Sequence, residues 1–240
     1  MLSNQPRSDE TLAYLDTAGL QLIQKKDEHR ITQDALLLAD FSLQAGVIGE
    51  AVDLGSGNGI VSLLLASDPQ IEKVTGLELQ PELVELGQRN VKLNGFENKV
   101  NICQGDWRQV RKVLKGQKFE LVVANPPYWE IGKGRINPEK KRAQARHEIA
   151  GALEELVIAC RYLVRPHKGY VNLIYPTQRL VELLVLLEKY QLQPKQLQFI
   201  HNNVNTQAKF FMLRATLHGQ RGLQVLPPAI SGLGKDSKCV

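Results

Sequence analysis

The sequence predicts an α/β fold with a seven-stranded, mostly parallel sheet, an antiparallel C-terminal edge and helices on both faces. Short apolar runs alternate with helical patterns along most of the 240 residues, which is typical of parallel strands joined by helices. A glycine-rich turn after the first run marks a strand end where a ligand can approach the main chain. The last two runs are joined by an asparagine-rich turn, which indicates that they pair antiparallel.

Most of the expected strands are short runs rich in apolar residues between turn-forming ones. We expect strands at residues 51–54, 73–78, 100–103, 119–124, 169–175, 195–200 and 209–217. We expect helices at residues 60–67, 81–94, 148–163 and 180–190. Pro81 suits the first turn of its helix, and Asn94-Gly95 suits the end of that helix.

Nothing in the composition divides the chain, so we expect one domain over residues 1–240 with its core at 46–217. Residues 1–45 form an N-terminal segment and residues 218–240 a tail.

No apolar stretch approaches the ~20 residues of a membrane span, and the N-terminus lacks a signal-peptide core. Three cysteines without metal-like spacing indicate free thiols in a reducing cytoplasm and no metal site. A net charge of +5 allows a polyanionic partner without requiring one.

The turn after the first strand reads Asp53-Leu54-Gly55-Ser56-Gly57-Asn58-Gly59. A dinucleotide-binding loop spaces its glycines as G-x-G-x-x-G, whereas Gly55, Gly57 and Gly59 follow a G-x-G-x-G spacing. The carboxylate of Asp53 disfavours a pyrophosphate and favours a cationic ligand. S-adenosylmethionine, which carries an ammonium and a sulfonium, fits this preference.

Further polar residues stand at the ends of the next strands. Glu78 ends the second strand, where a carboxylate can accept hydrogen bonds from both ribose hydroxyls of a nucleoside. Asp106 follows the third strand and can accept from an adenine amine. Alone, each acid reads as a solvated loop residue or a helix cap. Together with Asn125 after the fourth strand, they predict one binding site at the carboxyl edge of the sheet.

The fourth strand leads into Asn125-Pro126-Pro127-Tyr128, a stiff loop because its prolines restrict the main chain. It suits a flat substrate that bears an amine, either an extruded adenine or an amide. The Asn125 side-chain oxygen and the Pro126 carbonyl can each accept one amine hydrogen and so turn the nitrogen lone pair toward a methyl group. Tyr128 would stack on the base, and Trp129 is either a second stacking platform or a residue packed on the domain.

A basic segment, residues 132–147, follows this loop. Such a run is usually a solvated face, but its position next to the proposed catalytic loop favours a flap that contacts phosphates. Its candidate RNA-binding residues are Lys133, Arg135, Lys140, Lys141 and Arg142.

The ordered motifs resemble those of class I S-adenosylmethionine-dependent methyltransferases of the amino-methylating branch. The flanking sequences are similar to those of the tRNA1(Val) adenine-N6 methyltransferase family. These sequences are Ile23-Gln24, residues 31–39, Ala145-Arg146-His147-Glu148 and Val225-Leu226-Pro227-Pro228. The resemblance implies a Rossmann-like fold, S-adenosyl-L-methionine as cofactor, S-adenosyl-L-homocysteine as product, and tRNA as partner. It also implies that residues 1–45 flank the cofactor through Gln24 and Asp34, although Asp34 is equally well explained as a helix N-terminal acid.

We therefore expect a monomeric enzyme that methylates N6 of an adenine in tRNA, and that binds neither a membrane nor a metal. A glutamine-N5 methyltransferase of a release factor remains an alternative, since the same loop suits an amide. The 52 residues before Asp53 are too few for the helical substrate domain that such enzymes normally carry. Guanine-N2 methylation of ribosomal RNA, adenine methylation of DNA and a non-catalytic RNA-binding module are further alternatives.

Overall fold

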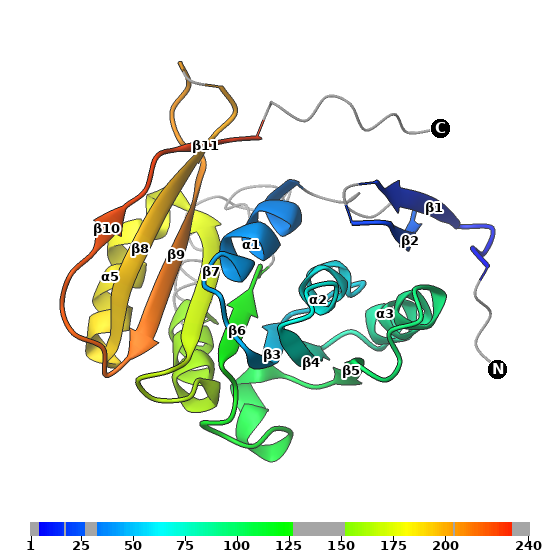
Figure 1. Cartoon of the computed structure of the whole chain (residues 1–240), viewed down its shortest axis with the longest axis horizontal. Helices are drawn as coiled ribbons and strands as arrows, with labels where there is room; N and C mark the ends of the chain where they lie inside the picture. Colours follow the sequence, from blue (N-terminus) through cyan, green and yellow to red (C-terminus); the bar gives the residue numbers. More distant parts are fainter. Residues whose placement is uncertain (1–4, 17, 27–32, 127–151, 204, 232–240) are drawn as a thin grey trace, which may run out of the picture.

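The computed structural model describes residues 5–16, 18–26, 33–126, 152–203 and 205–231 (Figure 1). Its strands are β1 (Glu10–Leu15), β2 (Leu20–Lys25), β3 (Gly49–Leu54), β4 (Ile71–Glu78), β5 (Val100–Gln104), β6 (Leu121–Ala124), β7 (Tyr170–Pro176), β8 (Leu192–His201), β9 (Phe210–Leu217), β10 (Gln224–Val225) and β11 (Ala229–Ile230). Its helices are α1 (Gln33–Leu43), α2 (Ile60–Ala66), α3 (Pro81–Leu93) and α5 (Leu180–Lys189), with 3₁₀ turns η1 (Trp107–Lys112) and η2 (Thr177–Arg179). A further helix covers residues 152–163.

The main sheet confirms the predicted α/β class but has nine strands rather than the expected seven. Its order is β10-β8-β9-β7-β6-β3-β4-β5, with β11 also paired to β8. The seven predicted strands correspond to β3 through β9. The two additional strands, β10 and β11, contain two residues each and run parallel to β8. Segments this short carry no alternating apolar pattern, so periodicity could not predict them.

The antiparallel part of the sheet is confined to one strand. β9 pairs antiparallel with β7 and with β8, so β8 itself runs in the direction of the parallel strands. The remaining neighbours, from β7 through β6, β3 and β4 to β5, are all parallel. Their carboxyl ends consequently meet at a single edge, which is the geometry that the site requires.

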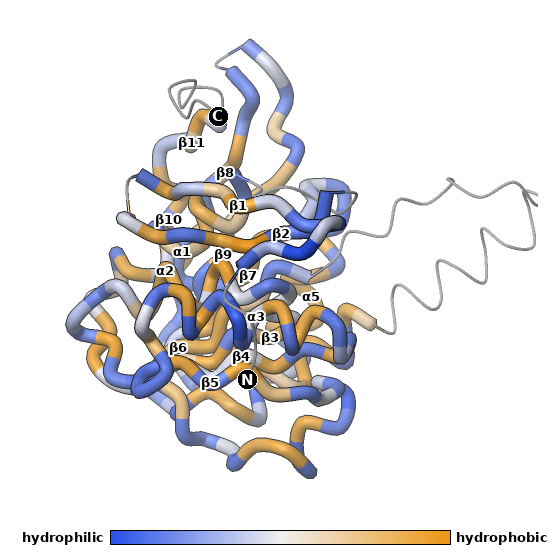
Figure 2. Tube along the Cα trace, turned by 90° about the vertical axis from the view of Figure 1, so that its right-hand side faces the viewer, coloured by the Kyte–Doolittle hydropathy of each residue, from blue (hydrophilic) through white to orange (hydrophobic). Residues whose placement is uncertain are grey.

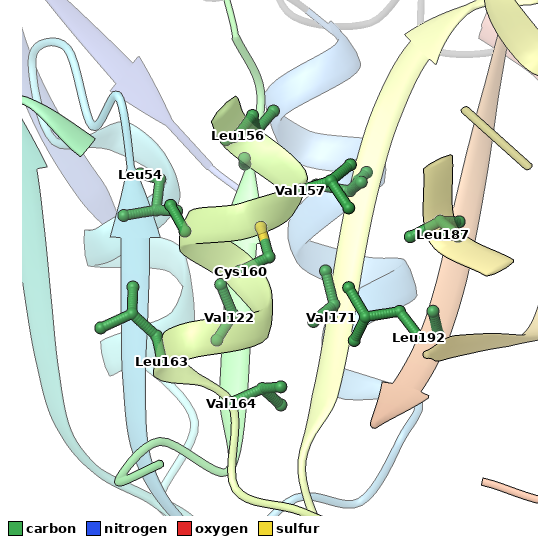
Figure 3. Packing of buried hydrophobic residues seen from close by; sticks show 14 of the residues in the cluster. Leu54, Val122, Leu156, Val157, Cys160, Leu163, Val164, Val171, Leu187 and Leu192 are labelled. Atoms are coloured by element: carbon green, nitrogen blue, oxygen red, sulfur yellow. The ribbon is translucent and has the colours of Figure 1, made fainter. Parts of the chain in front are cut away.

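Two apolar layers cover the sheet, and alternation along the strands assigns side chains to them. Val52 and Val122 belong to the layer formed with helix 152–163 and α5, whereas Ala51 and Leu121 belong to the layer formed with α2 and α3. Figure 3 shows Cys160 of helix 152–163 facing the strands on the first side. In Figure 2 the residues of the central strands are largely hydrophobic and the surface loops largely hydrophilic. None of the described helices is both long and apolar enough to cross a bilayer.

The N-terminal segment contains an antiparallel hairpin of β1 and β2 that the sequence analysis did not predict. The hairpin forms its own two-stranded sheet and packs on α3 rather than joining the main sheet (Figure 1). Leu22 and Ile23, whose side chains lie on opposite faces of β2, are both fully buried, so both faces of this strand are covered. The hairpin therefore extends the core over the outside of α3.

A buried ion pair fixes the hairpin to α3. Arg89 of α3 donates to both carboxylate oxygens of Glu10, at 2.7 and 2.8 Å, and to the main-chain oxygen of Gln5 at 2.7 Å. The two side chains are 1% and 3% exposed. Burial alone would raise the pKa of Glu10, but the hydrogen bonds from Arg89 and from the Arg7 amide lower it overall. Glu10 is therefore an anion held by its partners.

Removing the cation from this pair should be costly, because it leaves a buried carboxylate without compensation. We expect Arg89→Met to lower the free energy of unfolding by about 3–5 kcal/mol, measured by urea denaturation. The double variant Arg89→Met/Glu10→Met should lose less than the single variant, since it buries no charge. An Arg89→Met loss below 1 kcal/mol would contradict the prediction.

Candidate active site

Strand register brings the predicted polar residues to one edge of the sheet. Leu54 of β3 pairs with Ala124 of β6 and with Leu77 of β4, so Gly55 lies between Asn125 and Glu78. Asp106 follows β5, the next strand of the sheet beyond β4. Neighbouring strands are about 4.8 Å apart, so the edge from Asn125 to Asp106 spans about 14 Å. That length accommodates a nucleoside with a short side chain.

Glu78 holds the glycine loop by its main chain. One of its carboxylate oxygens accepts from the Gly57 amide and the other from the Gln80 amide, each at 2.9 Å. Gly57 has a φ of +54°, and a Cβ built on it would meet nothing within 4 Å. The loop therefore turns in a left-handed conformation with its open side available to a ligand. Each Glu78 oxygen keeps a second lone pair, which a ribose hydroxyl could use.

The indole of Trp107 packs against Gly55, a contact that the sequence analysis missed. A Cβ on Gly55 would lie 3.1 Å from Cζ3 of Trp107, and Gly55 has a φ of +76°, so a larger residue here would be strained and would press against the ring. Trp107 Nε1 and Ser56 Oγ are buried without a hydrogen-bond partner among the described residues. Such atoms are uncommon in native proteins and mark places where a ligand or water completes the structure.

Asp53 points into the protein rather than to the open side of the loop. Its side chain is buried and accepts a hydrogen bond of 2.8 Å from the Ser62 hydroxyl of α2. The pKa of Asp53 is raised to about 7, mainly by burial and also by the charge of Glu78, and the hydrogen bonds from Ser62 oppose this rise. Near neutral pH this carboxyl therefore exchanges between its neutral and charged forms.

Asp106 acts as a helix cap in the structure. It accepts from the Arg108 amide at 2.9 Å and forms an ion pair of 2.6 Å with the Arg108 guanidinium. The Arg108 hydrogen bond is the main reason that the pKa of Asp106 lies below its usual value. Asp106 can cap the helix and still be reached by a ligand at the sheet edge, because its side chain keeps 16% of its surface exposed.

Asn90 of α3 connects the glycine loop with the N-terminal hairpin. Its oxygen accepts from the Ile23 amide at 2.7 Å, and its nitrogen donates to the carbonyls of Ile23 at 3.0 Å and Asn58 at 2.9 Å. The hairpin strand that carries Gln24 is thereby fixed beside the loop. This residue was missed because an asparagine inside a helical pattern gives no functional signal in a single sequence.

Some of the remaining predicted residues belong to the described part of the structure, and the others lie outside it. Asp34 lies half-buried in the first turn of α1, and burial raises its pKa. Asn125 is half-buried and Pro126 buried at the end of β6. Pro127, Tyr128, Trp129, Lys133, Arg135, Lys140, Lys141 and Arg142 lie outside the described residues.

Residues 31–151, which include the glycine loop and the other strand ends of this edge, match the methyltransferase small domain. The chain belongs to this family. Its structure also resembles a predicted O-methyltransferase of Agrobacterium tumefaciens, with a TM-score of 0.65 and 20% identity over 85% of this chain and 90% of that one. The tRNA m1G37 methyltransferase of M. jannaschii is similar with a TM-score of 0.60 and 18% identity, over 88% and 58% of the two chains. These likenesses establish a methyltransferase fold.

Two kinds of name occur among curated relatives that are similar to this methyltransferase small domain protein. A tRNA1(Val) (adenine(37)-N6)-methyltransferase of Porphyromonas gingivalis is 30% identical over 68% of this chain and 65% of the relative. One from Shewanella loihica is 29% identical over 68% and 66%. A release factor glutamine methyltransferase of Vibrio cholerae is 35% identical over 62% and 56%. The chain thus spans about two thirds or less of the length of these relatives.

The family and the fold imply S-adenosyl-L-methionine as methyl donor and S-adenosyl-L-homocysteine as product. The residues of the edge fit this cofactor. Gly57 offers an open main chain, Glu78 retains acceptor capacity, and Trp107 Nε1 is a buried donor without a partner among the described residues. These residues would hold the cofactor across β3 and β4, next to Asn125.

The pKa of Asp53 makes a prediction about stability and pH. Because the folded state raises this pKa above the unfolded value of about 3.9, the folded protein binds more protons, and stability falls as pH rises toward 7. Asp53→Asn removes that proton uptake. We expect the free energy of unfolding of Asp53→Asn, relative to the native chain, to rise by up to about 1.4 kcal/mol per pH unit between pH 5 and 7 and then to level off. Parallel profiles for the two proteins in urea titrations would contradict this; Asp40→Asn, at an exposed position of α1, is the control.

The hydrogen bonds of Asn90 lead to a second prediction, which concerns cofactor binding separately from the stability of the hairpin. Asn90→Ala and Asn94→Ala should both loosen the hairpin, since Asn94 bonds the Gln21 main chain as Asn90 bonds that of Ile23. Only Asn90 also reaches the glycine loop. We expect Asn90→Ala, but not Asn94→Ala, to weaken the binding of S-adenosyl-L-methionine measured by calorimetry. The expected loss is about tenfold, which corresponds to one lost buried hydrogen bond. If both variants bind the cofactor with the same affinity and increase amide exchange at Ile23 to the same extent, the role of Asn90 is purely structural.

Proposed function

We propose that this chain catalyses S-adenosyl-L-methionine-dependent N6-methylation of an adenine in tRNA. The observation that carries the proposal is the position of Asn125 and Pro126 at the end of β6, beside Gly55 of the glycine loop. The cofactor supplies an electrophilic methyl group at this edge. A carboxamide oxygen and a main-chain carbonyl, placed one strand away, suit an acceptor nitrogen that carries two hydrogens.

The chain's own residues would act mainly by orientation. An exocyclic adenine amine is a weak nucleophile, because its lone pair is delocalised into the ring. Acceptance of its two hydrogens by Asn125 and Pro126 would direct the lone pair out of the ring plane, and no strong base is needed beforehand. Catalysis would then rest on positioning and on fixed dipoles in a partly desolvated site. Tyr128 would complete the site by stacking on the extruded base.

The names of the relatives support tRNA as substrate. The Porphyromonas gingivalis and Shewanella loihica proteins are named for adenine 37 of a valine tRNA, and each aligns with 68% of this chain. An anticodon-region adenine of a valine tRNA is accordingly the specific substrate that we propose. A base in a single-stranded loop also costs less to extrude than one in a duplex.

Methylation of a glutamine amide in a release factor is a second candidate. The Vibrio cholerae relative bears that name and is the more similar of the two kinds in identity, at 35%. It aligns with a smaller share of this chain, 62%. An amide nitrogen could use the same two acceptors, so the substrate must be separated by experiment.

The decisive assay offers methyl-labelled cofactor and the full chain to several substrates in parallel. These are a valine tRNA transcript, bulk ribosomal RNA, DNA and a purified release factor. We expect label in the tRNA alone, recovered as N6-methyladenosine after nuclease digestion. Label confined to the release factor would replace the tRNA proposal with the glutamine one.

Asn125 supplies the site-directed test. We expect Asn125→Ala to lower kcat by at least about 100-fold, comparable with removal of a fixed dipole from other active sites, while the cofactor Kd changes less than about threefold. Asn125→Asp, which keeps an acceptor oxygen, should retain more activity than the alanine variant. Full activity of Asn125→Ala would exclude the proposed role of the carboxamide.

A further inference from the structure

A hollow on the side of the sheet that helix 152–163 and α5 cover is separate from the candidate active site. Its volume is about 740 Å³, and it lies between η1, the end of helix 152–163 and the end of α5. We call it the cationic groove and define it by six of the residues that line it. They are Arg111, Gln117, Arg161, Tyr162, Lys189 and Tyr190.

The cationic groove lies at the amino edge of the sheet, opposite the carboxyl edge that carries the glycine loop. Gln117 precedes the entry into β6, Tyr162 lies in the last turn of the helix before β7, and Tyr190 lies two residues before β8. These three strands run in the same direction. The groove therefore cannot be part of the cofactor site, and the proposed chemistry leaves it unexplained.

Two arginines give the groove its charge. Arg111 stacks on the ring of Tyr162, with its guanidinium carbon 4.7 Å from the ring centre. Arg161 donates to the Tyr190 carbonyl at 3.0 Å and to the Gln191 side chain at 3.1 Å. Within the described part of the chain, neither arginine forms an ion pair with a carboxylate. Arg161 is thus held by two hydrogen bonds, whereas the exposed Arg111 is positioned by its stacking on Tyr162, and both guanidinium groups keep N–H groups able to bind an anion.

The neighbouring acids leave this charge largely intact. Glu154 pairs with Lys189 at 2.5 Å and accepts from the Tyr190 hydroxyl at 2.7 Å, so its charge is already matched. Glu188 approaches Arg221 at 3.8 Å. Lys189 lies over the ring of Tyr190, 5.2 Å from its centre. The groove consequently combines two uncompensated cations with flat guanidinium and phenol surfaces.

We propose that the cationic groove binds a nucleotide unit of an RNA strand, with Arg111 and Arg161 on the phosphate and the stacked Arg111–Tyr162 pair against the base. This inference rests on the proposed tRNA substrate. Fixed guanidinium forks suit phosphate oxygens, and RNA bases stack on arginine planes as well as on aromatic rings. The hollow is of the size of a small-molecule site and larger than a phosphate alone requires.

The distance between the two sites is compatible with one RNA. Helix 152–163 leads from the carboxyl edge toward the groove and is about 18 Å long at 1.5 Å per residue. An RNA whose target base is held at the carboxyl edge need extend only that far along the helix to reach the groove. The groove would then contribute affinity and orientation without taking part in methyl transfer.

Binding, rather than methylation, tests the groove. The full chain is titrated against a fluorescein-labelled tRNA transcript by anisotropy between 50 and 200 mM KCl. We expect Arg111→Gln to weaken binding roughly fivefold to tenfold at 100 mM salt and to reduce the slope of log K against log salt by about one. Arg111→Lys should keep the slope. Lys92→Gln, which removes an exposed cation of α3 on the opposite side of the sheet, should change neither quantity as much.

Each outcome decides the inference. Unchanged affinity and slope for Arg111→Gln, with native melting temperature, would overturn it, and so would displacement of the tRNA by polyglutamate as readily as by unlabelled RNA. If AMP binds at the groove but Arg111→Gln leaves the affinity for tRNA unchanged, the ligand of the groove is a free nucleotide and the RNA assignment fails. The result is independent of the enzymatic assay: a chain that methylates only release factor, yet binds RNA through Arg111, would refute the proposed function and retain the groove.

Discussion

The parallel pairing of β3 with β4 and β6 determines where the central residues of the candidate site, Asn125, Gly55 and Glu78, lie. Main-chain hydrogen bonds set this register and so bring these three residues into line across the edge. Glu78 then uses both carboxylate oxygens on main-chain amides, one of them within the glycine loop. Sheet register thus fixes the order of the residues across the edge, and a single carboxylate fixes the shape of the loop between them.

The surrounding elements stabilise this arrangement from one side. Arg89 and Asn90 are consecutive residues of α3, and each bonds the N-terminal hairpin, the former through Glu10 and the latter through the Ile23 main chain. Asn90 continues to Asn58 in the glycine loop. Displacing the hairpin would therefore remove partners from two buried polar side chains at once, and buried groups without partners are costly. The hairpin and the loop are expected to order together.

Much of this arrangement could be predicted from the sequence, because its physical basis is local. Most of the seven main strands are rich in apolar residues, and the glycine spacing, Glu78 and Asn125 lie at strand ends that can be recognised in the sequence. The hairpin, the inward direction of Asp53 and the Asn90 link depend instead on contacts between distant segments. Asp106 shows the limit clearly: both the cap and the sheet-edge interpretation were open, and the structure contains the cap at that edge.

The bonds from Asn90 to the hairpin end on main-chain atoms of Ile23, not on its side chain. Every residue except proline presents the same amide and carbonyl, so this link constrains the identity of position 90 but leaves position 23 free to vary among apolar residues. Replacing Ile23 by another apolar residue would thus keep the Asn90 link, whereas the contact of the hairpin with Arg89 depends on the carboxylate of Glu10.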